Sequence, residues 1–496
     1  MTKQIFILFM KSTTALLLSL ALVAVSCKKE TAVWQTISSE YVSTSEAPFP
    51  MSDVQAPIFP DQKYPITDYG AIALPVDGSG FPTSLDSSRV VRVNAKAFAD
   101  AMADCSASGG GYVVVPKGEW LTGPVKFQSS CNLYLSEGSV LVFSGKPDDY
   151  LPEEMSPWEG VECVNYCPLV YAYRCSKVGI SGTGTLRPIM TEWEKWFELT
   201  PEHVKGLQIL DRWGTFGEKW YKRNISGHKF QMRPPLVQFF QCTNVLLEDF
   251  KVRQSPQSSI HLYGCEEGVA RRLDVCAFGR GCDGLVLEMT RSFVVEDCTF
   301  EQGGDAMSLK SGRVYESWNS QASSHNILIR RCVVKRGKAL LSIGEEVSHG
   351  IHNVYMTDCK ATGAVDDLLS VRSNIRQGSS VDSIFVANCE AASLQRVFAI
   401  DTDVWGDWRD AMSHEKDTIN SIGGILMHDV KCRSAVALVD INGDKKNPAK
   451  DITIRNISAD SVYSYVSQVN NAEDVKISDI QYGWLGKSSK SPIRPE

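Results

Sequence analysis

A short sequence phrase recurs along the second half of this chain, and it constrains the fold more than any other feature. Four copies lie roughly 25 to 35 residues apart and end in cysteine: SFVVEDC (Cys298), NILIRRC (Cys332), NVYMTDC (Cys359) and SIFVANC (Cys389). Further copies place an apolar residue at the same position: Phe250, Leu273, Val430, Ile457 and Ile480. Each phrase alternates with the period of a β-strand, and no copy contains a helix-length amphipathic run. The repeat predicts an all-β solenoid, a parallel β-helix.

The cysteines of the phrase are expected to be thiols. In a β-helix, equivalent side chains of successive coils stack about 4.8 Å apart, so the four repeat cysteines predict a buried ladder of small apolar plugs instead of disulfides. Cys163, Cys167 and Cys175 lie outside that ladder, and a disulfide among them stays open. Their spacing, without a nearby pair of histidines, is weak evidence for a metal. We predict neither a metal nor a cofactor.

A different pattern precedes the repeats and predicts a cap. A strand-like DYGAI (Asp68–Ile72) is followed by Asn94, Phe98 and Ala101 at helical spacing, and then by a glycine-rich strand segment, Gly109–Phe127. A β-helix needs a cap because its open end would expose a sheet edge and the core. We therefore expect an amphipathic capping helix in front of the first coil.

Composition narrows the class of partner. With 43% hydrophobic and 22% charged residues, the chain has the composition of a globular protein with a sizeable core. The formal net charge is −7, and no run of five like charges occurs. Because a nucleic-acid backbone requires a basic surface, nucleic acid is an unfavourable partner.

The N-terminus predicts export. The apolar stretch Ala15–Val25 has the length of a signal-peptide core and is too short for a permanent membrane span. Ser26 and Cys27 form the end of a lipobox, in which the cysteine is acylated, although Ala24 stands where leucine is usual. The expectation is a bacterial lipoprotein of the periplasm or outer membrane, touching the membrane only through its lipid anchor. Plain secretion is the alternative.

These features divide the chain into three parts. Residues 1–27 are expected to be the signal peptide with its lipobox cysteine. Residues 28–60, rich in Ser, Thr, Glu and Pro, are expected to be a tether. Residues 61–496 are expected to form a single β-helix domain.

Several segments in order resemble a known family. They are DYGAI, GGGYVVVPKGEWLTGP, SGTGTLRP, RPPLVQFFQCTNV, SPQSSIHLYGC and GGDAMSLKSGR. Over roughly residues 60 to 485 the chain resembles glycoside hydrolase family 28, the polygalacturonases of pectin breakdown. The resemblance implies a right-handed parallel β-helix, like that of pectin lyases. It also implies hydrolysis, with inversion, of glycosidic bonds in galacturonate-containing polysaccharide or oligosaccharide.

The four site motifs of that family are only partly retained. At the Asn-Thr-Asp motif only Asp283 matches, and at Gly-Asp-Asp the second Asp is Asp305 while Gly304 replaces the family's general acid. Lys338 stands at the Gly-His motif, and the following SIGEE resembles the family's SIGSE and keeps Glu346. At Arg-Ile-Lys the cation is retained as Arg372, and the arginine is lost. Three residues continue that last motif: Ser373, Asn374 and Arg376.

The residues also form columns without reference to the family. Aligning the coils stacks Asp283, Asp305, Lys338 and Asp367, and, five residues further on, Glu288, Lys310, Ile343 and Arg372. Outward positions on strands are usually just solvated. Here the charges alternate and several glycines lie nearby, which favours a groove in which a ligand approaches the backbone closely.

The columns assign candidate roles. Inverting glycosidases hold their two carboxyl groups about 6.5–9.5 Å apart, and Asp305 and Asp367 are two coils, ~9.6 Å, apart. We therefore nominate Asp367 as the acid, with Glu345 or Glu346 on the neighbouring loop as the fallback. Asp283 and Asp305 are expected to share the base role, because their mutual repulsion raises one pKa.

The cations of the columns fit an acidic sugar. An arginine such as Arg372 grips a uronate carboxylate with two hydrogen bonds, and Lys338 acts as a point charge. Lys310 and Glu346 complete the predicted substrate-binding residues. Trp405 and Trp408 either stack on sugar rings or simply cover the coils.

Two alternatives to a hydrolase remain open. One is a polysaccharide lyase on the same fold, with Lys338 or Arg372 as base, which is disfavoured because no carboxylate cluster suits Ca²⁺. The other is a carbohydrate-binding relative that has lost catalysis, which Gly304 favours.

Overall fold

The computed structural model describes residues 40–74, 87–313, 322–374, 378–404 and 420–486. The chain divides into two compact units, Met1–Glu40 and Tyr41–Glu496. The predicted signal sequence, Cys27 and the first part of the predicted tether lie outside the described residues. So do Arg376, Trp405 and Trp408.

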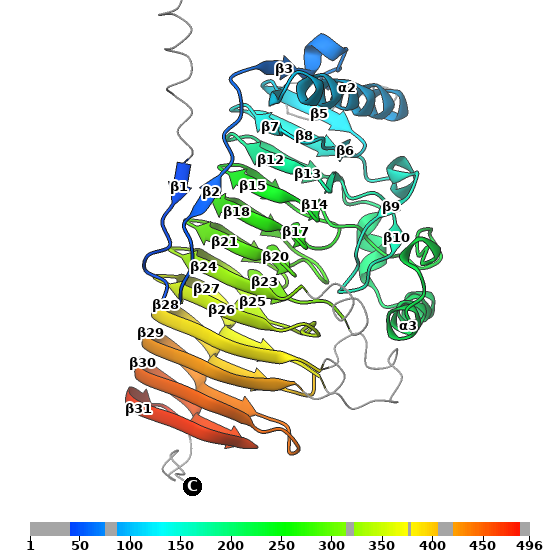
Figure 1. Ribbon diagram of the computed structural model, residues 1–496. Helices are drawn as coiled ribbons and strands as arrows, with labels where there is room; N and C mark the ends of the chain where they lie inside the picture. Colours follow the sequence, from blue (N-terminus) through cyan, green and yellow to red (C-terminus); the bar gives the residue numbers. More distant parts are fainter. Residues whose placement is uncertain (1–39, 75–86, 314–321, 375–377, 405–419, 487–496) are drawn as a thin grey trace, which may run out of the picture. The chain divides into compact units, whose positions relative to one another are not determined.

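The second unit is an all-β, right-handed parallel β-helix, as the repeat predicted (Figure 1). Its first coils are built from β3 (Lys63–Pro65), β4 (Gly111–Val115), β5 (Gly118–Thr122), β6 (Val125–Lys126), β7 (Cys131–Leu135), β8 (Ser139–Phe143), β11 (Val170–Tyr173), β12 (Ser176–Ser181) and β13 (Thr185–Pro188). The middle coils are β14 (Val237–Phe240), β15 (Thr243–Glu248), β16 (Lys251–Arg253), β17 (Ile260–Tyr263), β18 (Glu266–Arg271), β19 (Asp274–Ala277), β20 (Leu285–Glu288), β21 (Arg291–Glu296), β22 (Thr299–Gln302), β23 (Met307–Lys310) and β24 (Ser324–Arg330).

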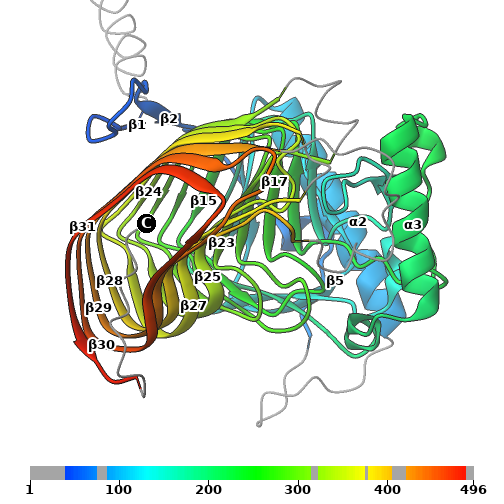
Figure 2. The same cartoon turned by 90° about the horizontal axis from the view of Figure 1, so that it is seen from below.

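In the last coils the short strands merge into longer ones. These are β25 (Val333–Ile343), β26 (Ile351–Thr357), β27 (Lys360–Arg372), β28 (Ser380–Asp401), β29 (Ser421–Asn442), β30 (Ala449–Asn470) and β31 (Ala472–Trp484). Every strand pair of the helix is parallel, because each strand pairs with its equivalent one coil away. Seen along the axis, the stacked strands enclose one core (Figure 2).

A left-handed turn residue explains the repeated phrase. The residue before each repeat cysteine has a positive φ: Asp297, Arg331, Asp358 and Asn388, all between 53° and 57°. Asp and Asn tolerate this conformation better than most residues. The turn directs the next side chain into the core, where the four cysteines are fully buried and free. Phe250, Leu273, Val430 and Ile457 are also buried at this position.

The thiol ladder leads to a measurable prediction. Because Cys298, Cys332, Cys359 and Cys389 are fully buried, an alkylating reagent should not reach them in the folded protein and should label all four after unfolding. Mass spectrometry of protein alkylated before and after denaturation, without reductant, tests this. A disulfide linking any two of the four would contradict it.

The predicted capping helix is α2 (Ser87–Ala107). It covers the first coils with Phe98, Ala101 and Met102, which belong to the main core. Asn94 is fully buried, and its side chain accepts a hydrogen bond from Ile72 N (2.7 Å) and donates to the carbonyl oxygens of Ile72 (2.9 Å) and Leu121 (2.7 Å). The amide therefore ties the incoming chain and the first coil to the helix. The strand expected at DYGAI is not formed, and the chain there enters η1 (Ile66–Tyr69), a 3-10 helix, instead.

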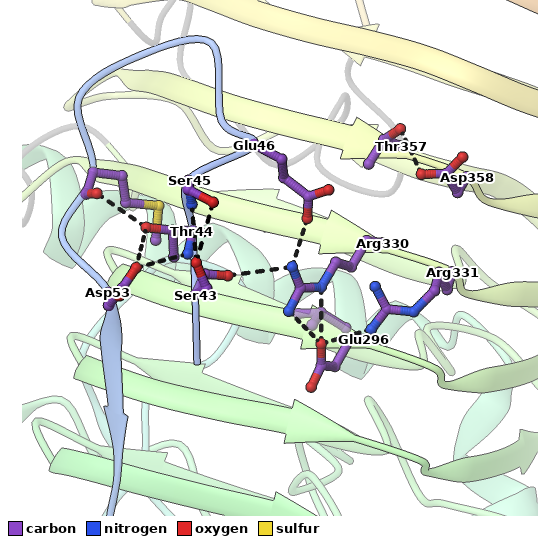
Figure 3. A network of polar contacts seen from close by, with 12 residues as sticks. Ser43, Thr44, Ser45, Glu46, Asp53, Glu296, Arg330, Arg331, Thr357 and Asp358 are labelled. Atoms are coloured by element: carbon purple, nitrogen blue, oxygen red, sulfur yellow. Dashed lines mark hydrogen bonds and ion pairs between the residues drawn. The ribbon is translucent and has the colours of Figure 1, made fainter. Parts of the chain in front are cut away.

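Residues 41–60, in the second half of the predicted tether, lie along the outside of the β-helix. β1 (Glu40–Val42) and β2 (Val54–Ala56) pair, and Val42, Val54, Ala56 and Phe59 cover an outward apolar column of Leu246, Val269, Val294 and Leu328. Beside this column Arg330 donates to Ser43 O (3.2 Å) and contacts Glu46 Oε1 (2.5 Å) and Glu296 (Figure 3). This part of the chain is packed against the coils.

Two insertions flank the β-helix. The first, between β8 and β11, contains η2 (Pro147–Tyr150), β9 (Glu154–Met155) and β10 (Val164–Asn165). The second, between β13 and β14, contains η3 (Trp193–Phe197), α3 (Pro201–Phe216) and η4 (Trp220–Lys222). Helix α3 runs beside the coils in Figures 1 and 2. Leu207 and Leu210 of α3 pack on Trp158 and Val161, which fixes the intervening loop. No helix among the described residues is long and apolar enough to cross a membrane.

Candidate active site

A polar pocket of about 190 Å³ opens over the ends of β20, β23, β25 and β27. It is lined by Glu159, Arg280, Gly281, Asp283, Gly304, Asp305, Lys310, Lys338, Gly344, Glu345, Glu346 and Arg372. Most of the residues nominated from the sequence are therefore brought together, and five carboxylates face four cations. Asp367 is the exception.

Asp283 and Asp305 form a close pair at one side of the pocket. Each precedes a strand by two residues, Asp283 before β20 and Asp305 before β23, and the two strands are adjacent. The backbone N–H of Asp305 donates to Asp283 Oδ1 (3.0 Å). Burial, reinforced by the negative charge of Asp305, raises the pKa of Asp283. The pair can thus hold a proton or a water between two acceptors.

A side chain at Gly304 would collide with the carboxylate of Asp283 as it is placed here. A Cβ atom there would lie 2.2 Å from Asp283 Oδ1 and 3.0 Å from the carbonyl oxygen of Cys282. The carboxylate of Asp283 therefore occupies the space next to the missing acid.

Arg372 reaches across the pocket from the end of β27. Its Nη2 donates to Asp305 Oδ2 and to Ser342 Oγ, and its Nε has no hydrogen-bond partner among the described residues. Burial by itself would lower the pKa of Arg372, but the nearby carboxylates, Asp305 first, outweigh this and raise it. The guanidinium is thus a fixed positive charge beside Asp305.

Glu346 is the anchor of a buried ion cluster. Its carboxylate accepts a hydrogen bond from Arg313 Nη2 (2.7 Å) and lies 3.1 Å from Lys310 Nζ. Burial opposes ionisation of Glu346, but Lys310 and Arg313 overcome it and lower its pKa to about 2. Burial would lower the pKa of Lys310, but the negative charges of Glu346 and Asp283 outweigh this and raise it. Glu346 and Lys310 therefore neutralise each other at the pocket wall.

Gly344 turns the chain so that Glu345 enters the pocket. Its φ is +99°, and a Cβ atom there would lie 1.9 Å from the carbonyl oxygen of Arg372, so only glycine fits. Glu345 is partly buried in the pocket. Its burial, and then the charge of Glu346, raise its pKa, while Arg372 lowers it in part.

Asp367 is engaged elsewhere. Arg396 donates to both of its carboxylate oxygens, at 2.8 and 2.7 Å, and contacts Asp440 at 3.3 Å. Asp367 is not among the described residues that line the pocket, whereas the exposed Lys338 is.

The predicted columns are wrong by one residue at two positions. Ala339, not Lys338, pairs with Asp367, and Ile343 pairs with Leu309, which leaves Gly344 level with Lys310. Residues 339–341 are all buried. Because a continuous apolar run does not alternate, it cannot fix the register of a strand.

Sequence reasoning missed that the first insertion contributes a residue to the pocket. Glu159 lies on the loop that α3 fixes, and nothing in its sequence context pointed to the site. Arg313 was part of a quoted motif, GGDAMSLKSGR, but received no role. Arg280 directly precedes the Asp283 motif, and only this position in the sequence indicated that it lies at the site.

The first insertion also covers the coils before the pocket. Ser156 Oγ donates to Gln238 Oε1 (2.9 Å), and Gln238 Nε2 contacts Pro157 O (3.1 Å) and His261 Nδ1 (3.0 Å). His261 in turn contacts Glu288 at 2.9 Å. This loop continues to Gly160, whose carbonyl oxygen accepts from Arg313 N (3.0 Å). The loop therefore covers the face over β14 and β17, next to the pocket.

Comparison with known proteins gives a consistent picture. The model of glycosyl hydrolases family 28 matches residues 188–479. A probable polygalacturonase of Vitis vinifera is 23% identical over 380 residues, which is 74% of this chain and 71% of the relative. The structure of a hyperthermoactive exopolygalacturonase from Thermotoga maritima matches with a TM-score of 0.74 and 27% identity, covering 86% of this chain and 94% of that one.

A second solved structure supports the fold. The family 28 exopolygalacturonase of Yersinia enterocolitica matches with a TM-score of 0.62 and 16% identity, over 89% of this chain and 81% of that one. The family match covers more than half of the chain, including every coil that contributes to the pocket. The chain belongs to glycosyl hydrolases family 28 and is a polygalacturonase-like glycoside hydrolase.

Proposed function

We propose that this protein hydrolyses glycosidic bonds in galacturonate-containing oligosaccharide or polysaccharide, from a chain end and with inversion. The observation that carries the proposal is the pocket in which Asp283 and Asp305 face several cations beside a closed end. A water held by the two carboxylates is activated for attack on the anomeric carbon. Arg372 keeps Asp305 oriented toward that water.

The cations support an acidic sugar as substrate. Lys338 is exposed at the pocket mouth, and Arg280 also lines it. A uronate carboxylate offers the charge that such groups bind, whereas a neutral sugar does not. Lys310 is occupied by Glu346, so we assign these two to shaping the pocket wall instead of gripping the substrate.

The closed end supports cleavage from a chain end. The loop of Ser156 to Gly160 covers the coils before the pocket, so a polymer cannot run through it in both directions. The Thermotoga maritima relative is called an exopolygalacturonase. Export and acylation at Cys27 remain predictions from the sequence.

Product analysis tests this function. Incubating the purified protein with a panel of galacturonate oligosaccharides should release one short product from the first minutes, with a new reducing end for each bond cleaved. A ladder of intermediate lengths would contradict the chain-end mode. An ultraviolet-absorbing unsaturated uronide would indicate a lyase, and binding without any product would indicate a protein that has lost catalysis.

A further inference from the structure

The site lacks a carboxyl group at the position that should protonate the leaving oxygen. Gly304 stands there, and Asp283 Oδ1 fills the adjacent space, fixed by its hydrogen bond from Asp305 N. A hydrolase with this pocket must take its proton from another residue of the lining.

Most other carboxylates near the pocket are committed to cations. Glu346 is held as an anion between Arg313 and Lys310. Asp305 accepts a hydrogen bond from Arg372. Asp367 forms a bidentate ion pair with Arg396.

Asp283 is excluded by its position. It and Asp305 lie on adjacent coils, about 4.8 Å apart at the backbone, on the same side of the pocket. Inversion requires the acid and the base on opposite sides of the bond, about 6.5–9.5 Å apart.

Glu345 lines the same pocket from the other end of the strands. Asp305 enters before β23, and Glu345 enters after β25, and the two strands are adjacent. The carboxylates therefore approach the pocket from opposite ends of the strands. Both act on the guanidinium of Arg372, Asp305 through a hydrogen bond and Glu345 through its charge.

We propose that Glu345 is the general acid of this site. The proposal rests on the proposed hydrolase function. The oxygen of the attacking water bonds to the anomeric carbon, and the Asp283–Asp305 pair takes the proton of that water. The bond from the anomeric carbon to the leaving oxygen breaks, and the leaving oxygen keeps the electron pair and takes the proton of Glu345. Exchange with solvent restores both carboxyl groups.

The electrostatics of the loop support this role. Burial and the neighbouring Glu346 anion raise the pKa of Glu345. A carboxyl group with a raised pKa keeps its proton closer to neutral pH, as a general acid must. In the SIGEE sequence, Glu346 thus stabilises the pocket wall through its ion pairs, and Glu345 donates the proton.

The test compares two leaving groups in the Glu345→Gln variant. On a galacturonate oligosaccharide, whose leaving oxygen needs a proton, kcat should fall by about 10²–10⁴-fold. On an aryl galacturonide, whose leaving group needs none, kcat should change by less than about tenfold. On the oligosaccharide, kcat of the wild type should fall at alkaline pH, and the variant should lack this fall. Glu390→Gln, in an exposed pair with Lys360, is the matched control.

Several results would overturn the assignment. They are full activity of Glu345→Gln on the oligosaccharide, equal loss on both substrates, or the leaving-group signature in Glu159→Gln instead. If Glu345→Gln does not fold, the wild type decides, because an alkaline fall of the same size on both substrates contradicts the role. A wild type that cleaves neither substrate would refute the proposed function, and this assignment with it.

Discussion

Replacing Asp305 by asparagine should lower kcat/KM by about 10²–10⁴-fold on both a galacturonate oligosaccharide and an aryl galacturonide. Because water must be activated whichever group leaves, kcat/KM should fall even on the substrate with the good leaving group. Asparagine cannot accept the proton of the water, although it still occupies the place beside Arg372 Nη2. The defect should therefore appear in kcat more than in substrate binding. Steady-state kinetics on the two substrates measures it.

The matched control is Asp358→Asn. Asp358 is an exposed turn residue with φ 55°, a conformation that asparagine also tolerates. Its kinetics should equal those of the wild type. An Asp305→Asn variant that retains wild-type rates on either substrate would remove Asp305 from the base role.

The Glu346→Gln substitution should lower the free energy of unfolding by about 3–5 kcal/mol. Arg313 and Glu346 are each only 3% exposed at the side chain, and Lys310 lies on the same carboxylate. Removing the negative charge leaves two cations in a poorly solvated site without the carboxylate that pairs with both of them. Chemical denaturation of the two proteins at neutral pH gives the difference. Glu390→Gln, which breaks an exposed pair, should cost at most about 1 kcal/mol.

The same pair has a pH dependence of defined sign. The pKa of Glu346 falls from 4.5 to about 2 in the folded protein, so the unfolded chain binds the proton more readily. The contribution of this carboxylate to stability is fully present above about pH 4.5 and is lost as the pH falls toward 2. Glu346→Gln should lack this component of the acid sensitivity. Equal unfolding free energies for wild type and variant at neutral pH would contradict the buried-pair account.

The fold could be predicted from the sequence because one local event repeats in every coil. A left-handed turn residue, such as Asp297 or Asp358, precedes a small buried side chain, and both leave a mark in the sequence. The registers of Lys338 and Ile343 could not be predicted. β25 and β27 shift register after Val334, and the run at 339–341 is buried throughout.

The acid-base assignment shows a second limit of sequence reasoning. Spacing along the coils nominated Asp367, but its partner Arg396 comes from the next coil, outside the motifs compared. Conversely, Glu345 was only a fallback, because a sequence does not show that Gly344 turns the chain into the pocket. The closed end depends on a loop of the first insertion that packs against α3 of the second, a contact that the sequence does not show.

The central claim is hydrolysis with inversion in the pocket of Asp283, Asp305 and Glu345. Proton NMR of the first product released from a galacturonate oligosaccharide, recorded before mutarotation, tests it most directly. The account predicts that the new reducing end first appears with the anomeric configuration opposite to that of the bond cleaved. A first product with the retained configuration, or an unsaturated uronide in its place, would contradict it.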